Sequence, residues 1–224
     1  IQFILKDLLI NSNNIDNFGA KLLAKHFVVF LFFFISGIFF YLILKKIIDN
    51  ENFNILGTIV YLTYPYLFGQ SMFSPKDVPF MSVWLISTYL SFLLIEEIIN
   101  KDKLRLKHVL VFSLCTAYLL SIRIAGILIF IQYLITFLIF LNFYKINFIF
   151  FLKRYYINLI IFFFTLVFFI FLFYPIFLIN PFLLIETFKV NASHFNNVGT
   201  TTFGKIMYAK NLPANYMLLW FAVK

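Results

Sequence analysis

Two charged residues, Asp77 and Arg123, interrupt long apolar sequence. A charge in such surroundings needs a partner, so both residues are candidates for binding or catalysis. A carboxylate at the mouth of an apolar segment is costly when it is buried without a partner, although the positive end of a helix dipole offsets part of that cost. Arginine costs about 2.5–3.5 kcal/mol at the centre of a membrane helix, so it requires an anion or the lipid–water interface. Phosphate suits it, because the planar guanidinium matches the spacing of phosphate oxygens.

The same residues also have simpler interpretations. Asp77 would then cap the N-terminus of a helix, and the neighbouring Lys76 would extend its side chain to the interface. Arg123 would be an interfacial arginine in the turn of a helical hairpin. The local sequence leaves both interpretations open.

Other candidates carry weaker signals. Glu186 and His194 have side chains suited to acid–base chemistry or metal binding, but no spacing matches a metal-ligand signature, and surface roles are the simpler alternative. Tyr64, Tyr66 and Tyr216 could stack on a sugar ring or belong to the aromatic belt of a membrane interface.

Membrane-spanning helices are the elements that must position these residues. The 224 residues are 63% hydrophobic and 12% charged, with a mean hydropathy of +0.97, whereas soluble domains are only about half apolar. Apolar runs of about twenty residues, the length that crosses the hydrocarbon core, recur along the chain. We therefore predict an all-α polytopic transmembrane bundle with the lipid bilayer as its partner.

The remaining composition excludes other classes of protein. The formal net charge of +9 comes from lysines and arginines that cluster between apolar runs, which is a topology signal and not a nucleic-acid-binding surface. Cys115 is the single cysteine and lies inside an apolar run, so the chain can form neither an internal disulfide nor a thiolate metal site. The oligomeric state stays open.

The apolar runs predict about six complete or partial spans and a truncated last one. The expected segments are 26–44, 55–68, 78–95, 109–122, 124–144, 157–179 and 213–222. Pro65 should bend the second segment, and Pro79 falls in the first turn of the third, where its missing N–H costs nothing. Because position 1 is isoleucine and the chain stops inside an apolar run, we expect residues 1–224 to be a fragment of a single transmembrane domain.

The basic residues predict the orientation of the bundle. Three loops hold half of the 18 lysines and arginines, namely 45–54, 96–108 and 145–156. Loops rich in basic residues face the cytoplasm. The segments expected on the opposite face are the loops 1–25, 69–77 and 180–212, together with the turn at Arg123.

Three stretches together resemble a known family. Residues 65–80 have a proline-interrupted span that leads into Ser-Pro-Lys-Asp-Val-Pro-Phe, and residues 121–127 read Ser-Ile-Arg-Ile-Ala-Gly-Ile. Residues 204–221 contain Asn-Leu-Pro-Ala-Asn-Tyr, in which Ala214 departs from the usual aromatic. In order and spacing these stretches resemble the bacterial branch of the dolichyl-phosphate-mannose-protein mannosyltransferase-like family, membrane glycosyltransferases of the GT-C fold.

The resemblance implies transfer of a hexose or pentose from a polyprenyl-phosphate donor to a lipid, glycan or protein acceptor. The reaction would occur on the periplasmic or extracellular face of a bacterial inner membrane. Lys76 and Arg123 would bind the donor phosphate, and Asp77 would orient a basic partner or a metal. The catalytic base would lie outside the fragment. The expected acceptor or sugar contacts are Tyr64, Tyr66, Glu186, His194 and Tyr216; no cofactor is assigned, and a divalent metal stays open.

Two other classes of protein fit part of the pattern. A membrane transporter or lipid flippase should carry polar residues through the middle of its spans, whereas the ionisable residues outside the basic loops are expected at one face. A non-catalytic scaffold would use Asp77 and Arg123 only as topology anchors. The shared-site hypothesis predicts that Asp77, Arg123 and the start of segment 180–212 lie on the same face.

Overall fold

The computed structural model describes residues 17–101, 103–180, 182–193, 199–202, 205–208, 211–213 and 215–216. Helix dominates these residues, and the strands among them form one short hairpin. The chain divides into two compact units, Ile1–Phe173 and Tyr174–Lys224. We describe each unit by itself.

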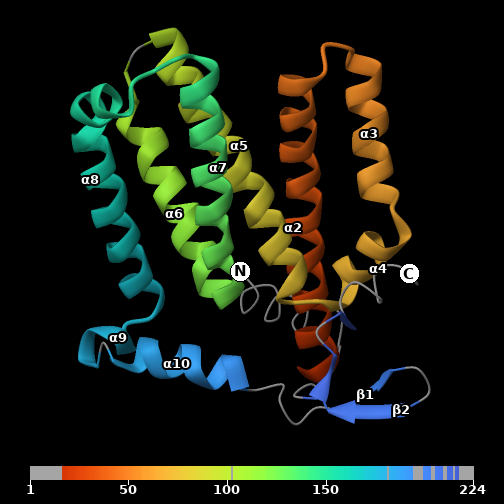
Figure 1. Cartoon of the computed structure of the whole chain (residues 1–224). Helices are drawn as coiled ribbons and strands as arrows, with labels where there is room; N and C mark the ends of the chain where they lie inside the picture. Colours follow the sequence, from red (N-terminus) through yellow and green to blue (C-terminus); the bar gives the residue numbers. More distant parts are fainter. Residues whose placement is uncertain are drawn as a thin grey trace. The chain divides into compact units, whose positions relative to one another are not determined.

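The first unit is a bundle of helices packed side by side (Figure 1). Its elements are α2 (Asn17–Ile47), α3 (Glu51–Thr63), α4 (Pro65–Phe73), α5 (Asp77–Lys101), α6 (Leu106–Ile122), the 3₁₀ turn η1 (Ile124–Leu128), α7 (Ile129–Phe143) and α8 (Phe148–Phe173). Helix α2 packs against α3, α4 and α5, while α6 packs against α5 and α8.

Four segments of this unit are long and apolar enough to cross a membrane. They are Gly19–Ile47, Asp77–Asn100, Ile124–Phe143 and Phe148–Phe173, and Leu106–Ile122 is a shorter apolar helix. Large apolar side chains lie exposed along the outer surfaces of the last two, among them Ile139 and Phe164. Such a surface is stable in lipid and unfavourable in water. The prediction of a mostly helical protein is thus confirmed, and the described residues contain four candidate membrane-spanning segments where the sequence predicted about six complete or partial spans.

The helix boundaries differ from the prediction in several places. Helix α2 begins at Asn17, well before position 26, and α8 begins at Phe148, where the side chain of Asn147 accepts the N–H of Ile149 at 2.8 Å. Part of the segment expected as loop 145–156 is therefore helical. Residues 69–73 belong to α4 and not to a loop. Helices α2 and α8 extend beyond their apolar runs, because hydropathy identifies only the part of a helix that suits lipid and the backbone hydrogen bonds continue past it.

The predicted breaks occur where proline requires them. Helix α3 ends before Tyr64, whose φ of −58° and ψ of 117° lie outside the helical region, and α4 starts at Pro65. The residue before a proline avoids helical angles because the pyrrolidine ring crowds it. Pro79 lies in the first turn of α5, as predicted.

Charged residues mark two ends of the first unit. At the first, which we call the basic end, Lys46 pairs with Glu96 at 2.5 Å, and Glu97 pairs with Arg105. Side chains of the connection between α7 and α8 pack beside the end of α5 there. The predicted basic loops thus gather at one end. The second, which we call the Arg123 end, holds Asp77 and Arg123.

The second unit contains short elements where the sequence predicts a long loop. They are α9 (Ile176–Ile179), α10 (Phe182–Ser193), and the strands β1 (Gly199–Thr202) and β2 (Lys205–Tyr208), which pair antiparallel with Gly199 opposite Tyr208. The loop predicted at 180–212 therefore contains a helix and a hairpin. Most of the predicted last span, 213–222, lies outside the described residues.

Candidate functional site

Asp77 is the first residue of α5, and Ser74 holds its carboxylate. The Ser74 hydroxyl donates to Asp77 Oδ2 at 2.8 Å, and the Asp77 N–H approaches Ser74 Oγ at 3.3 Å. A serine three residues before an acidic residue is a known helix-start pattern. The sequence analysis missed Ser74, although that spacing could have identified it. The arrangement fixes one carboxylate oxygen and leaves the other free to face a cation.

Arg123 lies in the tight connection between α6 and η1. Its backbone is extended, with φ −148° and ψ 140°, and its C=O accepts the N–H of Gly126 at 2.9 Å. A Cβ at Gly126 would lie 2.9 Å from the backbone oxygen of Leu119, so the turn can pack against the end of α6 only with glycine there. The hairpin turn predicted around Arg123 is confirmed.

The two residues form an ion pair between Arg123 Nη2 and Asp77 Oδ1. Packing of Val83 on α5 against Leu119 and Ile129 brings their segments together. The Arg123 and Asp77 side chains remain 44% and 58% exposed, respectively. Exposed pairs of this kind contribute only about 0–1 kcal/mol, so the pair can open or accept a further partner. The prediction of a shared face is confirmed for Asp77 and Arg123, and it stays a prediction for the start of segment 180–212, which belongs to the second unit.

No family model, curated protein or solved structure matches the chain. The site must therefore be interpreted from its own chemistry. Guanidinium has five N–H donors. Because Asp77 contacts only Nη2 of Arg123, other N–H groups of the guanidinium can still donate to an anion with several oxygens, such as phosphate.

The other predicted site residues are spread over the chain. Lys76 is exposed beside Asp77, and Tyr64 and Tyr66 are exposed at the break between α3 and α4. Glu186 is exposed on α10 and Tyr216 is partly buried, both in the second unit. His194 lies outside the described residues. The structure thus brings Asp77 and Arg123 together, while Glu186 and Tyr216 belong to the second unit, which is described by itself.

The described residues contain no group of three or more His, Cys, Asp or Glu side chains that could hold a metal ion. The divalent metal that the sequence left open thus has no candidate ligand set in this part of the chain. Asp77 has a basic partner in Arg123.

A second group of polar residues, which the sequence analysis did not identify, lies between the helices. Trp84 Nε1 donates to Gln132 Oε1 at 2.5 Å, and Gln132 Nε2 donates to Thr88 Oγ1 at 2.8 Å. Thr165 donates to Ser113 at 2.8 Å between α8 and α6. All these side chains are neutral, and each bonds to a side chain on a neighbouring helix, as polar residues do when they hold membrane helices together. A lone glutamine in the apolar sequence of α7 was the available signal.

Proposed function

We propose that this chain belongs to a membrane glycosyltransferase that moves a sugar from a polyprenyl-phosphate donor to a lipid, glycan or protein acceptor. The site would be the Arg123 end of the first unit. The observation that supports this most directly is the Asp77–Arg123 pair, which joins two stretches that resemble glycosyltransferase motifs at the exposed end of an apolar bundle.

The proposed chemistry needs a cation beside the leaving phosphate. As the bond between the sugar C1 and the phosphate oxygen breaks, negative charge grows on the phosphate, and Arg123 with Lys76 would stabilise it. Asp77, held by Ser74, would orient the guanidinium. A bond forms between C1 and the acceptor oxygen, whose proton passes to a carboxylate base. We assign that base to no residue of this chain.

The location of the pair also suits a lipid-linked donor. The polyprenyl tail would lie against the apolar helix surfaces, while the phosphate stays at the water boundary where the pair is exposed. The basic loops gather at the other end of the unit, so the positive-inside rule favours a non-cytoplasmic site. In a bacterium this would be the outer face of the inner membrane.

A transporter or lipid flippase is the competing proposal, and the contacts of Trp84, Gln132 and Thr88 inside the bundle favour it. A substrate pathway needs polar groups along the spans. These side chains, however, bond to one another. The described residues show no carboxylate or basic side chain in this network.

Transfer assays on the complete protein in vesicles would test the proposal. We expect Arg123→Gln and Asp77→Asn each to lower sugar transfer from a polyprenyl-phosphate sugar by about a hundredfold, because a stabiliser of the transition-state charge is lost or misoriented. Lys103→Gln, an exposed charge at the basic end, serves as the matched control and should keep full activity. Near-normal transfer in both site variants would overturn the assignment. Lipid or solute translocation that requires Gln132, without sugar transfer, would support the transporter instead.

A further inference from the structure

The Asp77–Arg123 pair lies where two apolar segments begin. Asp77 is the first residue of the candidate span Asp77–Asn100, and Arg123 directly precedes the candidate span Ile124–Phe143. The two side chains remain 58% and 44% exposed, respectively. In a bilayer, the first residues of a span lie near the level of the lipid headgroups. The pair therefore meets the phosphates of the surrounding phospholipids as well as the phosphate of any lipid-linked substrate.

An arginine without a partner at this level would bind the surrounding lipid. Its guanidinium stays charged and donates two parallel hydrogen bonds to a phosphate. A basic side chain near the membrane surface favours an anionic phospholipid about fivefold over a zwitterionic one. Because a lipid-linked sugar is a minor component of a membrane, ordinary phospholipids would then occupy Arg123 most of the time.

Asp77 gives Arg123 a negative partner before any ligand arrives. Its Oδ1 contacts Arg123 Nη2, while its Oδ2 accepts the Ser74 hydroxyl at 2.8 Å. Ser74 Oγ also lies 3.3 Å from the Asp77 N–H, so it holds the carboxylate at the first turn of α5. The segments on both sides of the pair, 69–80 and 119–129, are fully described. The partner of Arg123 is thus fixed by the local structure of the helix start.

We infer that Asp77 is a specificity-determining residue, which neutralises Arg123 toward ordinary anionic phospholipids and releases it only to a ligand that makes further contacts. The identity of that ligand rests on the proposed function. A phospholipid offers the guanidinium a phosphate in place of the carboxylate and gains little by the exchange. A lipid-linked sugar adds the contacts of its sugar, so it can displace Asp77. Since an exposed ion pair is weak, the displacement lowers the affinity for this ligand by only about fivefold or less.

Quenching by brominated lipids would test the inference on the complete protein in vesicles, without a sugar donor. Ile127→Trp places a fluorescent reporter in η1, just after Arg123, at a position that is 49% exposed. Each protein without the reporter gives the background from Trp84 and Trp220. The quantity compared is the association of brominated phosphatidylglycerol relative to brominated phosphatidylcholine. Asp77→Asn should raise this ratio about fivefold over the protein with the pair intact, and an unchanged ratio would overturn the inference.

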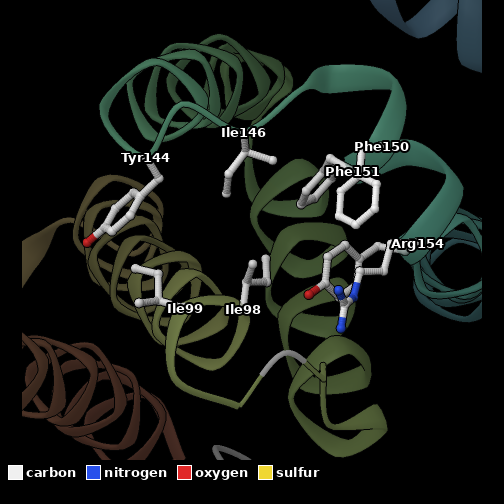
Figure 2. Close-up of a pocket in the computed structure, with 8 residues that line it drawn as sticks. Ile98, Ile99, Tyr144, Ile146, Phe150, Phe151 and Arg154 are labelled. Carbon is white, nitrogen blue, oxygen red and sulfur yellow. The ribbon is translucent and has the colours of Figure 1, made fainter.

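Two arginine variants locate the effect. Arg123→Gln combined with Asp77→Asn should abolish the gain, because the phosphate then has no guanidinium to bind. Arg154 lines a cavity of about 300 Å³ at the basic end, beside Phe150 (Figure 2). Arg154→Gln combined with Asp77→Asn removes the same charge far from the reporter and should keep the gain. A gain that survives without Arg123, or that disappears without Arg154, would overturn the inference.

A carboxylate at the other end of the unit is the matched control for Asp77. Glu51 is the exposed first residue of α3, which follows α2 at the basic end, and it accepts the Tyr41 hydroxyl at 3.2 Å. Glu51→Gln removes one negative charge, as Asp77→Asn does, and should leave the lipid ratio unchanged. An equal gain in both variants would show a response to net charge alone and would overturn the inference.

Binding of a fluorescent polyprenyl-phosphate sugar separates this inference from the proposed function. Added phosphatidylglycerol should leave its binding to the intact pair almost unchanged and should weaken its binding to Asp77→Asn about fivefold. Equal sensitivity of the two proteins would overturn the inference, even where sugar transfer is observed. If neither protein binds the sugar donor while the lipid ratio changes as expected, the proposed function fails and the exclusion of phospholipid by Asp77 is still supported.

Discussion

The two ends of the first unit each place a carboxylate beside a guanidinium, but they do so in different ways. At the basic end the Glu97 side chain is only 5% exposed and accepts the backbone N–H of Arg105 at 3.0 Å. It also lies 3.3 Å from Arg105 Nε in an ion pair and 3.0 Å from His108 Nδ1. At the Arg123 end, Asp77 is 58% exposed and shares its charge with Arg123 and Ser74. One carboxylate is enclosed by its partners, and the other remains open to water.

This difference separates a structural contact from a candidate binding contact. A buried carboxylate with several donors closes the turn between α5 and α6, and any ligand would have to displace those donors at high cost. An exposed pair costs little to rearrange. The exposed pair can therefore exchange partners with a phosphate during a reaction, while Glu97 keeps α5 and α6 joined.

The largest expected effect is on stability at the basic end. Glu97→Gln should lower the free energy of unfolding by about 3 kcal/mol, the lower part of the range for breaking a buried ion pair, because Arg105 stays partly hydrated. Asp77→Asn should cost about 1 kcal/mol or less. Unfolding of both variants in the same detergent measures the contrast. An equal loss of unfolding free energy in the two variants would contradict the distinction between an enclosed carboxylate at Glu97 and an open one at Asp77.

A second variant tests whether close backbone packing between the turn at Gly126 and the end of α6 stabilises the Arg123 end. Gly126→Ala should destabilise by about 1–3 kcal/mol, since its Cβ would press against backbone atoms of Leu119 that cannot move aside. Gly69→Ala in α4 is the matched control, because a Cβ there meets nothing within 4 Å, and it should be neutral or slightly stabilising. If Gly126→Ala proved as harmless as the control, the close approach of the turn to α6 would be wrong.

The sequence predicts features that depend on neighbouring residues better than it predicts contacts between distant helices. Alternation of apolar and basic stretches correctly predicted a mostly helical chain with long apolar helices and the gathering of the basic loops at one end. A membrane favours both features, since lipid requires apolar helix surfaces and basic residues collect in the loops on one side. Pro65 also predicted the break between α3 and α4, since its effect is local. These features depend on residues near one another in sequence.

Partners across the bundle were not predictable in the same way. The sequence predicted that Arg123 and Asp77 lie on the same face but not that the two side chains pair directly, because packing of α5 on α6 decides which charges meet. Lys153 and Arg154 suggested a loop, yet they lie in α8, since a helix at the interface tolerates charges that hydropathy counts against it. The sequence around Gln132 did not indicate that its side chain accepts a hydrogen bond from Trp84.

Lys145, at the basic end, has a left-handed backbone conformation that favours glycine, so a substitution there can raise the stability of the protein. Lys145→Gly should stabilise the protein by about 1 kcal/mol, because the left-handed backbone there strains any residue with a Cβ. Lys153→Gly, the same change inside helix α8, should instead destabilise by about 1 kcal/mol. Unfolding measurements on the two variants give opposite signs if the turn has this conformation. Destabilisation by Lys145→Gly would argue against it.

The smallest effect concerns the polar contacts between the two ends. A double-mutant cycle of Trp84→Phe and Gln132→Leu should give a coupling free energy of about 0.6 kcal/mol, typical of hydrogen bonds between membrane helices. Single variants alone would mislead, because each leaves the other polar group without its partner. Thr88→Val serves as a further probe, since it removes the acceptor of the second Gln132 bond. A coupling near zero would mean that Trp84 and Gln132 do not hold α5 to α7. The hydrogen-bonding groups of Gln132 would then be available to a solute, which is what the competing transporter proposal requires.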